Sequence, residues 1–111
     1  MDKLTSYRQL TQKILKKYAN TQYAYGNYKN NTVFDHENDH YLVMSLGWDS
    51  GRRVHGCLIH IDIINQKIWI QRDGIEHGIA QDFLDEGVPK SDIVLGFKSE
   101  YLRPYTEFAV N

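Results

Sequence analysis

Hydrophobic and polar residues alternate most regularly between positions 57 and 73. In the first arm of this stretch the odd positions are apolar, namely Cys57, Ile59, Ile61 and Ile63. The even positions carry a mixed set, namely Leu58, His60 and Asp62. In the second arm, Ile68 and Ile70 share one face. A period of two predicts strands that bury one face, so we expect a β-hairpin in which Cys57 is a small core residue.

The same pattern predicts how the two arms pair. A two-residue turn at Asn65-Gln66 sets Ile63 opposite Ile68. It also sets Asp62 opposite Trp69 on the other face. A slip of one residue would turn the isoleucines of one arm to water, so the register is well specified. Tight hairpin turns prefer glycine at their second position, which is absent here, so we expect a longer or bulged loop.

A helix is predicted directly after the hairpin. Its apolar residues form one stripe at helical spacing, namely Ile79, Ala80, Phe83 and Leu84. Asp73 or Gly74 can cap its start, and Gly87 followed by Pro89 suits its end. Together with the hairpin isoleucines, Phe83 and Leu84 complete the predicted core.

The rest of the chain supplies a further helix and two further strands. Apolar residues at intervals of three and four predict an amphipathic helix over residues 2–19. Residues 20–31 are typical of a loop, and strands are predicted at 32–36 and 41–48. The run 93–95 is too short to assign. The aromatic tail 101–110 is too apolar to remain in solvent, so we expect it to dock on the body.

These elements predict a single domain over residues 1–111, a length that suits one hydrophobic core. The fold class is α+β, with an antiparallel or mixed β-sheet of about four to five strands. An N-terminal helix and a second helix after the central hairpin are expected to cover one face of that sheet.

Composition narrows the function classes. Hydrophobic residues make up 41% of the chain and charged residues 24%, and the net charge is −1. This balance is ordinary for a globular protein and gives no general attraction to nucleic acid or to anionic membranes. The single cysteine excludes an internal disulfide, so a cytoplasmic location is expected. No apolar run approaches the ~20 residues that span a bilayer.

The polar run 35–40, Asp-His-Glu-Asn-Asp-His, contains side chains that can bind a divalent metal. However, metal ligands converge because a rigid scaffold aims them, and a short polar turn does not provide one. Asp and Asn in such runs commonly bond their own backbone. We therefore interpret this run as a turn and expect neither a metal nor a cofactor.

His60 and Asp62 lie on the face opposite the isoleucines. A His-Asp pair can orient a general base. No serine is placed as its nucleophile, and Cys57 is expected on the other face. We favour a surface or half-buried polar pair and expect no catalytic residues.

Four residues are candidates for contact with a partner or a phosphate, namely Arg52, Arg53, Trp69 and Arg103. Arginine can stack on tryptophan or grip a carboxylate or phosphate in a bidentate manner, and Arg52-Arg53 lies near Trp48. An ion pair within the protein or at an interface is favoured over nucleic acid. The tyrosines of loop 20–31 can stack bases, but packing on the sheet is the favoured interpretation.

Short sequence motifs follow one another in a fixed order along nearly the whole chain. The strongest are Arg52-Arg53-Val54, His60-Ile61-Asp62-Ile63, Lys67-Ile68-Trp69-Ile70-Gln71, Gly87-Val88-Pro89-Lys90 and Asp92-Ile93-Val94-Leu95-Gly96-Phe97. In this order they resemble the XisI family, the fdxN element excision controlling factor proteins of cyanobacteria. One departure is Asn65-Gln66, where the family pattern has an Asp-Gly-like turn.

The resemblance implies an XisI-like fold and a role in programmed DNA rearrangement. Family members act with a partner called XisH to support or control excision of a DNA element by a separate recombinase during heterocyst differentiation. XisH resembles an endonuclease, whereas XisI does not look catalytic, and the family supplies no catalytic or ligand residues to carry over. We therefore expect an accessory factor, not an enzyme, that acts with an XisH-like protein.

Two alternatives remain open. A sequence-unspecific DNA-binding protein would use Arg52, Arg53 and the tyrosine loop. An unrecognised hydrolase or nuclease would use His60 and Asp62. A homo-oligomer is also compatible with the sequence, because an exposed Trp69 and the edge of the sheet invite pairing.

Overall fold

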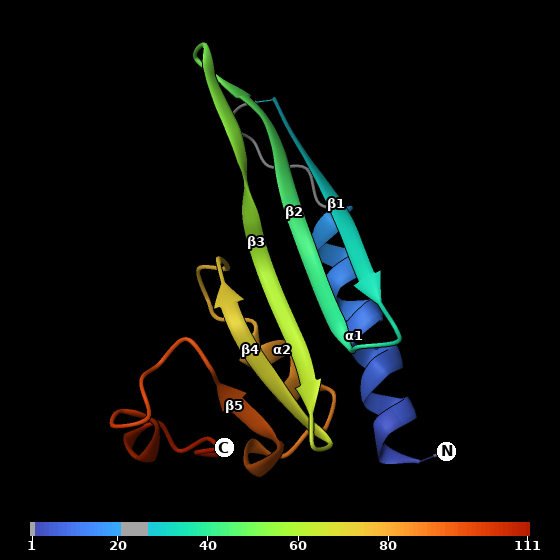
Figure 1. The fold of residues 1–111 in the computed structure, drawn as a ribbon, viewed down its shortest axis with the longest axis vertical. Helices are drawn as coiled ribbons and strands as arrows, with labels where there is room; N and C mark the ends of the chain where they lie inside the picture. Colours follow the sequence, from blue (N-terminus) through green and yellow to red (C-terminus); the bar gives the residue numbers. More distant parts are fainter. Residues whose placement is uncertain (1, 21–26) are drawn as a thin grey trace.

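The computed structural model describes residues 2–20 and 27–111 (Figure 1). The elements in chain order are α1 (Lys3–Ala19), β1 (Asn27–Asp35), β2 (His40–Asp49), β3 (Arg52–Ile64), β4 (Lys67–Asp73), α2 (Ala80–Asp85), the 3₁₀ turn η1 (Lys90–Asp92), β5 (Ile93–Leu95) and the 3₁₀ turn η2 (Arg103–Tyr105). One sheet contains five strands in the order β1-β2-β3-β4-β5. Strands β1 to β4 pair antiparallel and β5 runs parallel to β4, which confirms the predicted α+β fold.

Both helices cover the same face of the sheet. Figure 1 shows α1 behind β1 and β2, and α2 behind β4. The buried residues of α1 recur at helical spacing, namely Tyr7, Thr11, Ile14, Leu15 and Tyr18. Its start is capped by the Asp2 carboxylate, which accepts a hydrogen bond from the Thr5 backbone N–H at 2.7 Å. We call the helix-covered side the inner face and the opposite side the outer face.

The β3–β4 hairpin has the predicted register. Ile63 pairs with Ile68, and Asp62 pairs with Trp69. The expected longer loop is wrong, because Asn65 and Gln66 form a two-residue turn with φ of 51° and 61°. Two successive residues with positive φ form a turn whose twist matches the right-handed twist of the flanking strands. The twist of the hairpin thus outweighs the steric penalty that a non-glycine residue pays at the second position.

A β-bulge at Leu58 changes the predicted facing of β3. Val43 pairs with Ile59, but the next residue, Met44, pairs with Cys57. Leu58 is therefore an extra residue, and the alternation reverses on its N-terminal side. Leu58 packs against the core, whereas Cys57 lies beside Met44 on the outer face. The prediction of Cys57 as a core residue is wrong for this reason.

Two other element boundaries differ from expectation. β1 begins at Asn27, so it includes Tyr28 and much of the predicted loop; Tyr23 and Tyr25 lie outside the described residues. α2 begins only at Ala80 rather than after Asp73. The intervening turns are held by the Asp73 carboxylate, which accepts hydrogen bonds from the backbone N–H groups of Ile75 and Ile79 at 3.0 Å each.

The predicted docking of the C-terminal segment on the body is confirmed for its end, whereas Tyr101, Leu102 and Tyr105 remain exposed. The Ala109 N–H donates to the Ile93 carbonyl oxygen at 2.9 Å, and Phe108 packs against the core. The Lys67 ammonium donates to the Asn111 carbonyl oxygen at 2.7 Å. In the described part of the chain, no helix is long and apolar enough to cross a membrane.

Candidate functional site

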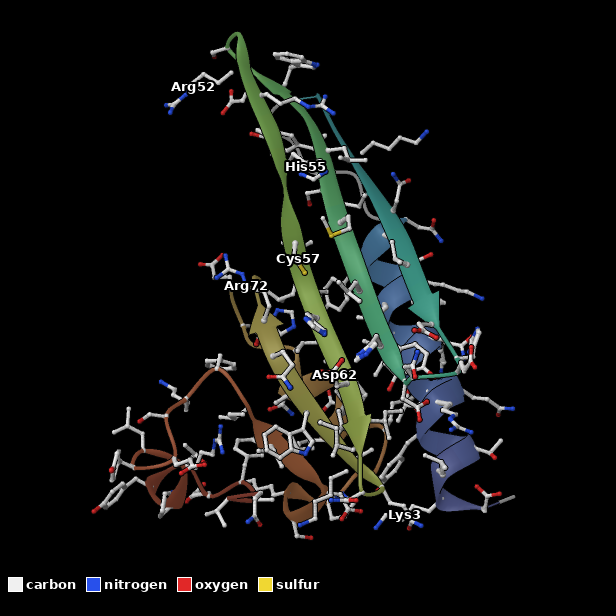
Figure 2. The ribbon with its side chains drawn as sticks, in the orientation of Figure 1. Lys3, Arg52, His55, Cys57, Asp62 and Arg72 are labelled. Carbon is white, nitrogen blue, oxygen red and sulfur yellow. The ribbon has the colours of Figure 1, made fainter. Side chains whose placement is uncertain are left out.

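A group of polar side chains lies on the outer face of β2, β3 and β4. We call His40, His60, Asp62 and Gln71 the outer-face cluster. His60 and Asp62 are two positions apart on β3, so they project from the same face. His40 lies directly opposite Asp62 on β2. Figure 2 shows Asp62 in the half of β3 nearer the β3–β4 turn.

Gln71 joins the cluster through a second β-bulge. His60 pairs with Arg72 and Ile61 pairs with Ile70, which leaves Gln71 as an extra residue on β4. A bulge changes the direction of a side chain relative to a regular strand. The Gln71 side-chain amide donates to Asp62 Oδ2 at 3.2 Å. The cluster therefore includes the bulge residue of β4, and the bulge of β3 lies two residues from His60.

Asp62 is the centre of the cluster. Its Oδ1 lies 2.6 Å from His40 Nδ1 and 2.8 Å from His60 Nε2. The residue is only 8% exposed, so its carboxylate depends on these partners rather than on water for its hydrogen bonds. The two imidazole rings are 6.2 Å apart and nearly perpendicular, with an interplanar angle of 77°.

The negative charge of Asp62 is paired with histidines. In the described part of the chain, the ion-pair partners of Asp62 are His40 and His60. The hydrogen bond to Asp62 and the attraction of its charge raise the pKa of His40. His40 and His60 therefore offer Asp62 a full positive charge only when one of their imidazole rings is protonated.

The sequence grouped His60 with Asp62 but missed His40. The run 35–40 does form the predicted turn: the Asp35 carboxylate accepts from the N–H groups of Glu37 and Asn38 at 3.0 and 3.1 Å. His40, however, is the first residue of β2 rather than part of that turn. Pairing Tyr41 with Ile61 places His40 opposite Asp62. The apolar pattern of β2 does not signal this pairing, because its more apolar alternate set, which begins at Leu42 and Met44, lies on the outer face.

The four candidate contact residues do not converge on one site. The Arg53 guanidinium lies over Trp48, with Cζ 5.3 Å from a ring centroid, and the exposed Arg52 lies beside this pair at the β2–β3 tip (Figure 2). Arg103 lies over Trp69 at 5.2 Å, on the C-terminal segment. The expectation of an exposed Trp69 is wrong, because that segment half-buries it. Whether these residues bind a partner stays a prediction.

The thiol of Cys57 is a weak nucleophile in this setting. Burial raises its pKa, and the thiol donates a hydrogen bond to the Ile59 carbonyl oxygen at 3.2 Å. A protonated thiol reacts slowly, because the thiolate is the nucleophile. The carboxylate and imidazoles of the outer-face cluster are, in contrast, groups that can bind a cation or a hydrogen-bonding group.

Comparisons with known proteins agree with this fold. A sequence model of the XisI protein family matches residues 1–110. The chain belongs to the XisI family. The crystal structure of an XisI-like protein from Anabaena variabilis has 35% sequence identity and a TM-score of 0.89, and the match covers 97% of this chain and 99% of that one.

A second crystal structure, that of the fdxN element excision controlling factor XisI from Anabaena variabilis, has 37% identity and a TM-score of 0.84. The match covers 99% of this chain and 100% of that one. Among curated proteins none is a significant match. The resemblance to the XisI family that the sequence motifs indicated is confirmed. The family is one named for control of fdxN element excision.

Proposed function

We propose that this protein is a non-catalytic controlling factor for excision of a DNA element, and that it acts by binding an XisH-like, endonuclease-related protein. Membership of the XisI family and the excision-control name of a relative with 37% identity support the excision role. The XisH-like partner is what the resemblance in sequence implies.

The observation that carries partner binding is the surface of the C-terminal segment. Eight large hydrophobic side chains in the described part of the chain are exposed, and five of them lie between residues 97 and 110: Phe97, Tyr101, Leu102, Tyr105 and Val110. Tyr101 and Tyr105 are 88% and 84% exposed. Gathered apolar side chains mark interaction sites, and tyrosine is enriched in protein interfaces.

The absence of catalysis in this proposal rests on the composition of the outer-face cluster. The hydrogen bonds of His60 and Asp62 in the described residues link them to His40 and Gln71, none of which is a serine or cysteine nucleophile. A controlling subunit needs a stable surface rather than reactive groups. Substitution of His60 by Ala is therefore expected to leave partner binding intact.

Co-purification tests this proposal. A tagged chain is expressed with an XisH-like protein from the same genome, and native mass measurement gives the stoichiometry. We expect a stable complex that the double variant Tyr101→Ser/Tyr105→Ser weakens by at least about tenfold, which corresponds to ~1.4 kcal/mol. Val33→Ser, which removes a side chain that is 50% exposed on β1, is the matched control. An XisH-like protein that always purifies alone would refute the proposal.

Direct DNA contact is a second candidate function, favoured by the β2–β3 tip. This hairpin rises beyond the helices (Figure 1), and Trp48, Arg52 and Arg53 are exposed at its end. The net charge of −1 opposes it. Gel shifts across a salt series test it: binding that weakens with salt and with Arg52→Gln/Arg53→Gln supports contact, and no shift at low salt removes it.

A further inference from the structure

We infer that His40, His60 and Asp62 form a binding site for one divalent transition-metal ion of the zinc class. Each residue offers one ligand atom, and the three atoms lie within 4.8 Å of one another. This replaces the expectation, drawn from the sequence, that the protein binds no metal. The inference goes beyond the excision role and does not depend on the XisH-like partner.

The positions of the ligand atoms are close to those that an ion requires. Zinc bonds of about 2.0–2.2 Å place tetrahedral ligand atoms about 3.3–3.6 Å apart. The present distances to Asp62 Oδ1 are 2.6 Å from His40 Nδ1 and 2.8 Å from His60 Nε2. An opening of somewhat under 1 Å would therefore admit the ion.

The side chains that must move are the ones free to do so. The His40 and His60 side chains are 48% and 32% exposed, whereas that of Asp62 is 12% exposed. A small rotation of the two imidazole rings opens the site while the carboxylate stays in place. The nitrogens that now face the carboxylate are the atoms that would bind the ion after losing their protons.

The strands supply the rigid scaffold that a polar turn lacks. Asp62 lies between Ile61 and Ile63, which are both buried on the inner face. His40 precedes Tyr41, which is also fully buried. Strand β3 is the central strand of the sheet, with β2 and β4 paired on its two sides. The backbone beneath all three ligands is thus fixed by the core.

The ligand chemistry selects the class of ion. Two imidazole nitrogens and one carboxylate oxygen suit Zn²⁺, Co²⁺, Ni²⁺ or Fe²⁺, whereas Mg²⁺ and Ca²⁺ prefer oxygen ligands throughout. Gln71 donates to the second oxygen, Asp62 Oδ2, which leaves Oδ1 for the ion. An outer hydrogen bond of this kind orients a metal-binding carboxylate. Three protein ligands leave a fourth position for water or for a group from a bound molecule.

A neutral alternative is that two histidines simply hydrogen-bond a buried carboxylate. The metal site and this metal-free alternative are distinguished by titrating the chelator-stripped full chain with Co²⁺ and monitoring the visible absorption bands of the ion. We expect one equivalent of Co²⁺ to bind with a tetrahedral-type spectrum, Zn²⁺ to displace it, and millimolar Mg²⁺ to leave it unchanged. Isothermal titration with Zn²⁺ gives the affinity and stoichiometry independently.

Variants show which residues hold the ion. His60→Gln and Asp62→Asn are each expected to weaken Co²⁺ binding by more than about tenfold. His40→Gln should do the same and is the variant least able to disturb folding, because the His40 side chain is the most exposed of the three at 48%. The matched control is His55→Gln, which changes an exposed histidine on β3, the strand that also carries His60 and Asp62. This variant should bind Co²⁺ like the wild type. Circular dichroism and urea midpoints check that each variant is folded.

Three results would overturn the site: no saturable Co²⁺ or Zn²⁺ binding, binding that His40→Gln, His60→Gln and Asp62→Asn all leave unchanged, or displacement of Co²⁺ by Mg²⁺. Each of these leaves the co-purification experiment untouched. Loss of the metal site and loss of the partner can therefore be told apart.

Discussion

The two faces of the same sheet have opposite characters. On the inner face, Tyr41, Val43, Ile59 and Ile61 are fully buried beneath the helices. On the outer face, the same strands present a polar cluster, flanked by partly exposed apolar residues and two arginine–tryptophan pairs. Since alternate residues of each strand build the two faces, stability and binding can be altered separately.

The largest expected effect comes from opening the inner face. Ile61→Ala removes a fully buried side chain at the centre of the sheet, and the resulting cavity should lower the free energy of unfolding by about 2–5 kcal/mol. Ile64→Ala is the matched control at the end of the same strand, where the side chain is 40% exposed, and should cost less than about 1 kcal/mol. Equal urea midpoints for the two variants would contradict the assigned faces.

The next effect comes from a polar contact on the inner side. The Tyr7 hydroxyl of α1 donates to Asp92 Oδ2 at 2.5 Å, and both residues are buried. Tyr7→Phe leaves the carboxylate without this donor, and we expect a loss of about 1–3 kcal/mol at pH 7. Tyr105→Phe, at an exposed tyrosine, should leave the urea midpoint unchanged.

This loss should depend on pH. Burial would raise the pKa of Asp92, but its hydrogen bonds with Lys3 and Tyr7 outweigh burial and hold the pKa below its usual value. A depressed pKa stabilises the fold above the unfolded value, about 3.9, and that stabilisation is lost as pH falls through the folded pKa. The difference between wild type and Tyr7→Phe should therefore shrink between about pH 5 and pH 2. A constant difference across that range would contradict the assignment.

A smaller effect is expected where the C-terminal segment covers the outer face. Arg103 lies over Trp69 and also donates to the Lys98 carbonyl oxygen at 3.0 Å. Arg103→Ala should cost about 1 kcal/mol and increase acrylamide quenching of Trp69, measured with Trp48→Phe as the background. Arg53→Ala in that background is the matched control and should leave the quenching unchanged.

The smallest effect concerns a single hydroxyl of α1. In the described part of the chain, Thr11 Oγ1 is buried without a hydrogen-bond partner. Thr11→Val replaces it with a methyl group and should raise stability by up to about 1 kcal/mol. Thr106→Val should have the opposite sign, because that hydroxyl donates to the Arg103 carbonyl oxygen at 2.8 Å and accepts from the Phe108 N–H at 3.2 Å. A melting series of the two variants checks both signs.

The inner face was predictable because its signal is periodic. Isoleucines at alternate positions favour the observed β3–β4 register, because a slip of one residue would turn those of one arm to water. The bulge at Leu58 escaped prediction, because Cys57 and Leu58 are both apolar and either can occupy a dry position. The late start of α2 was missed for a different reason: Asp73 bonds the turn before the helix rather than the helix itself.

The outer-face cluster was only half predictable. His60 and Asp62 share a strand, so their spacing alone groups them. His40 and Gln71 come from neighbouring strands, and their positions depend on cross-strand register. For Gln71 that register includes a bulge, which has no local sequence signature. Residues that meet across strands are thus harder to find from sequence than residues that meet along one.

The bulge at Leu58 also bears on how relatives of this chain can differ in length. Val43 keeps Ile59 and Met44 keeps Cys57 as partners, with Leu58 the extra residue between them. A homologue without that residue could therefore form a regular strand with every other pairing and facing preserved. Sequence alignments should therefore place single-residue gaps at this position. Such a gap keeps the strand register on both sides, at the cost of the core contact of Leu58 and of the hydrogen bond that the Gly74 N–H donates to its carbonyl oxygen at 2.8 Å.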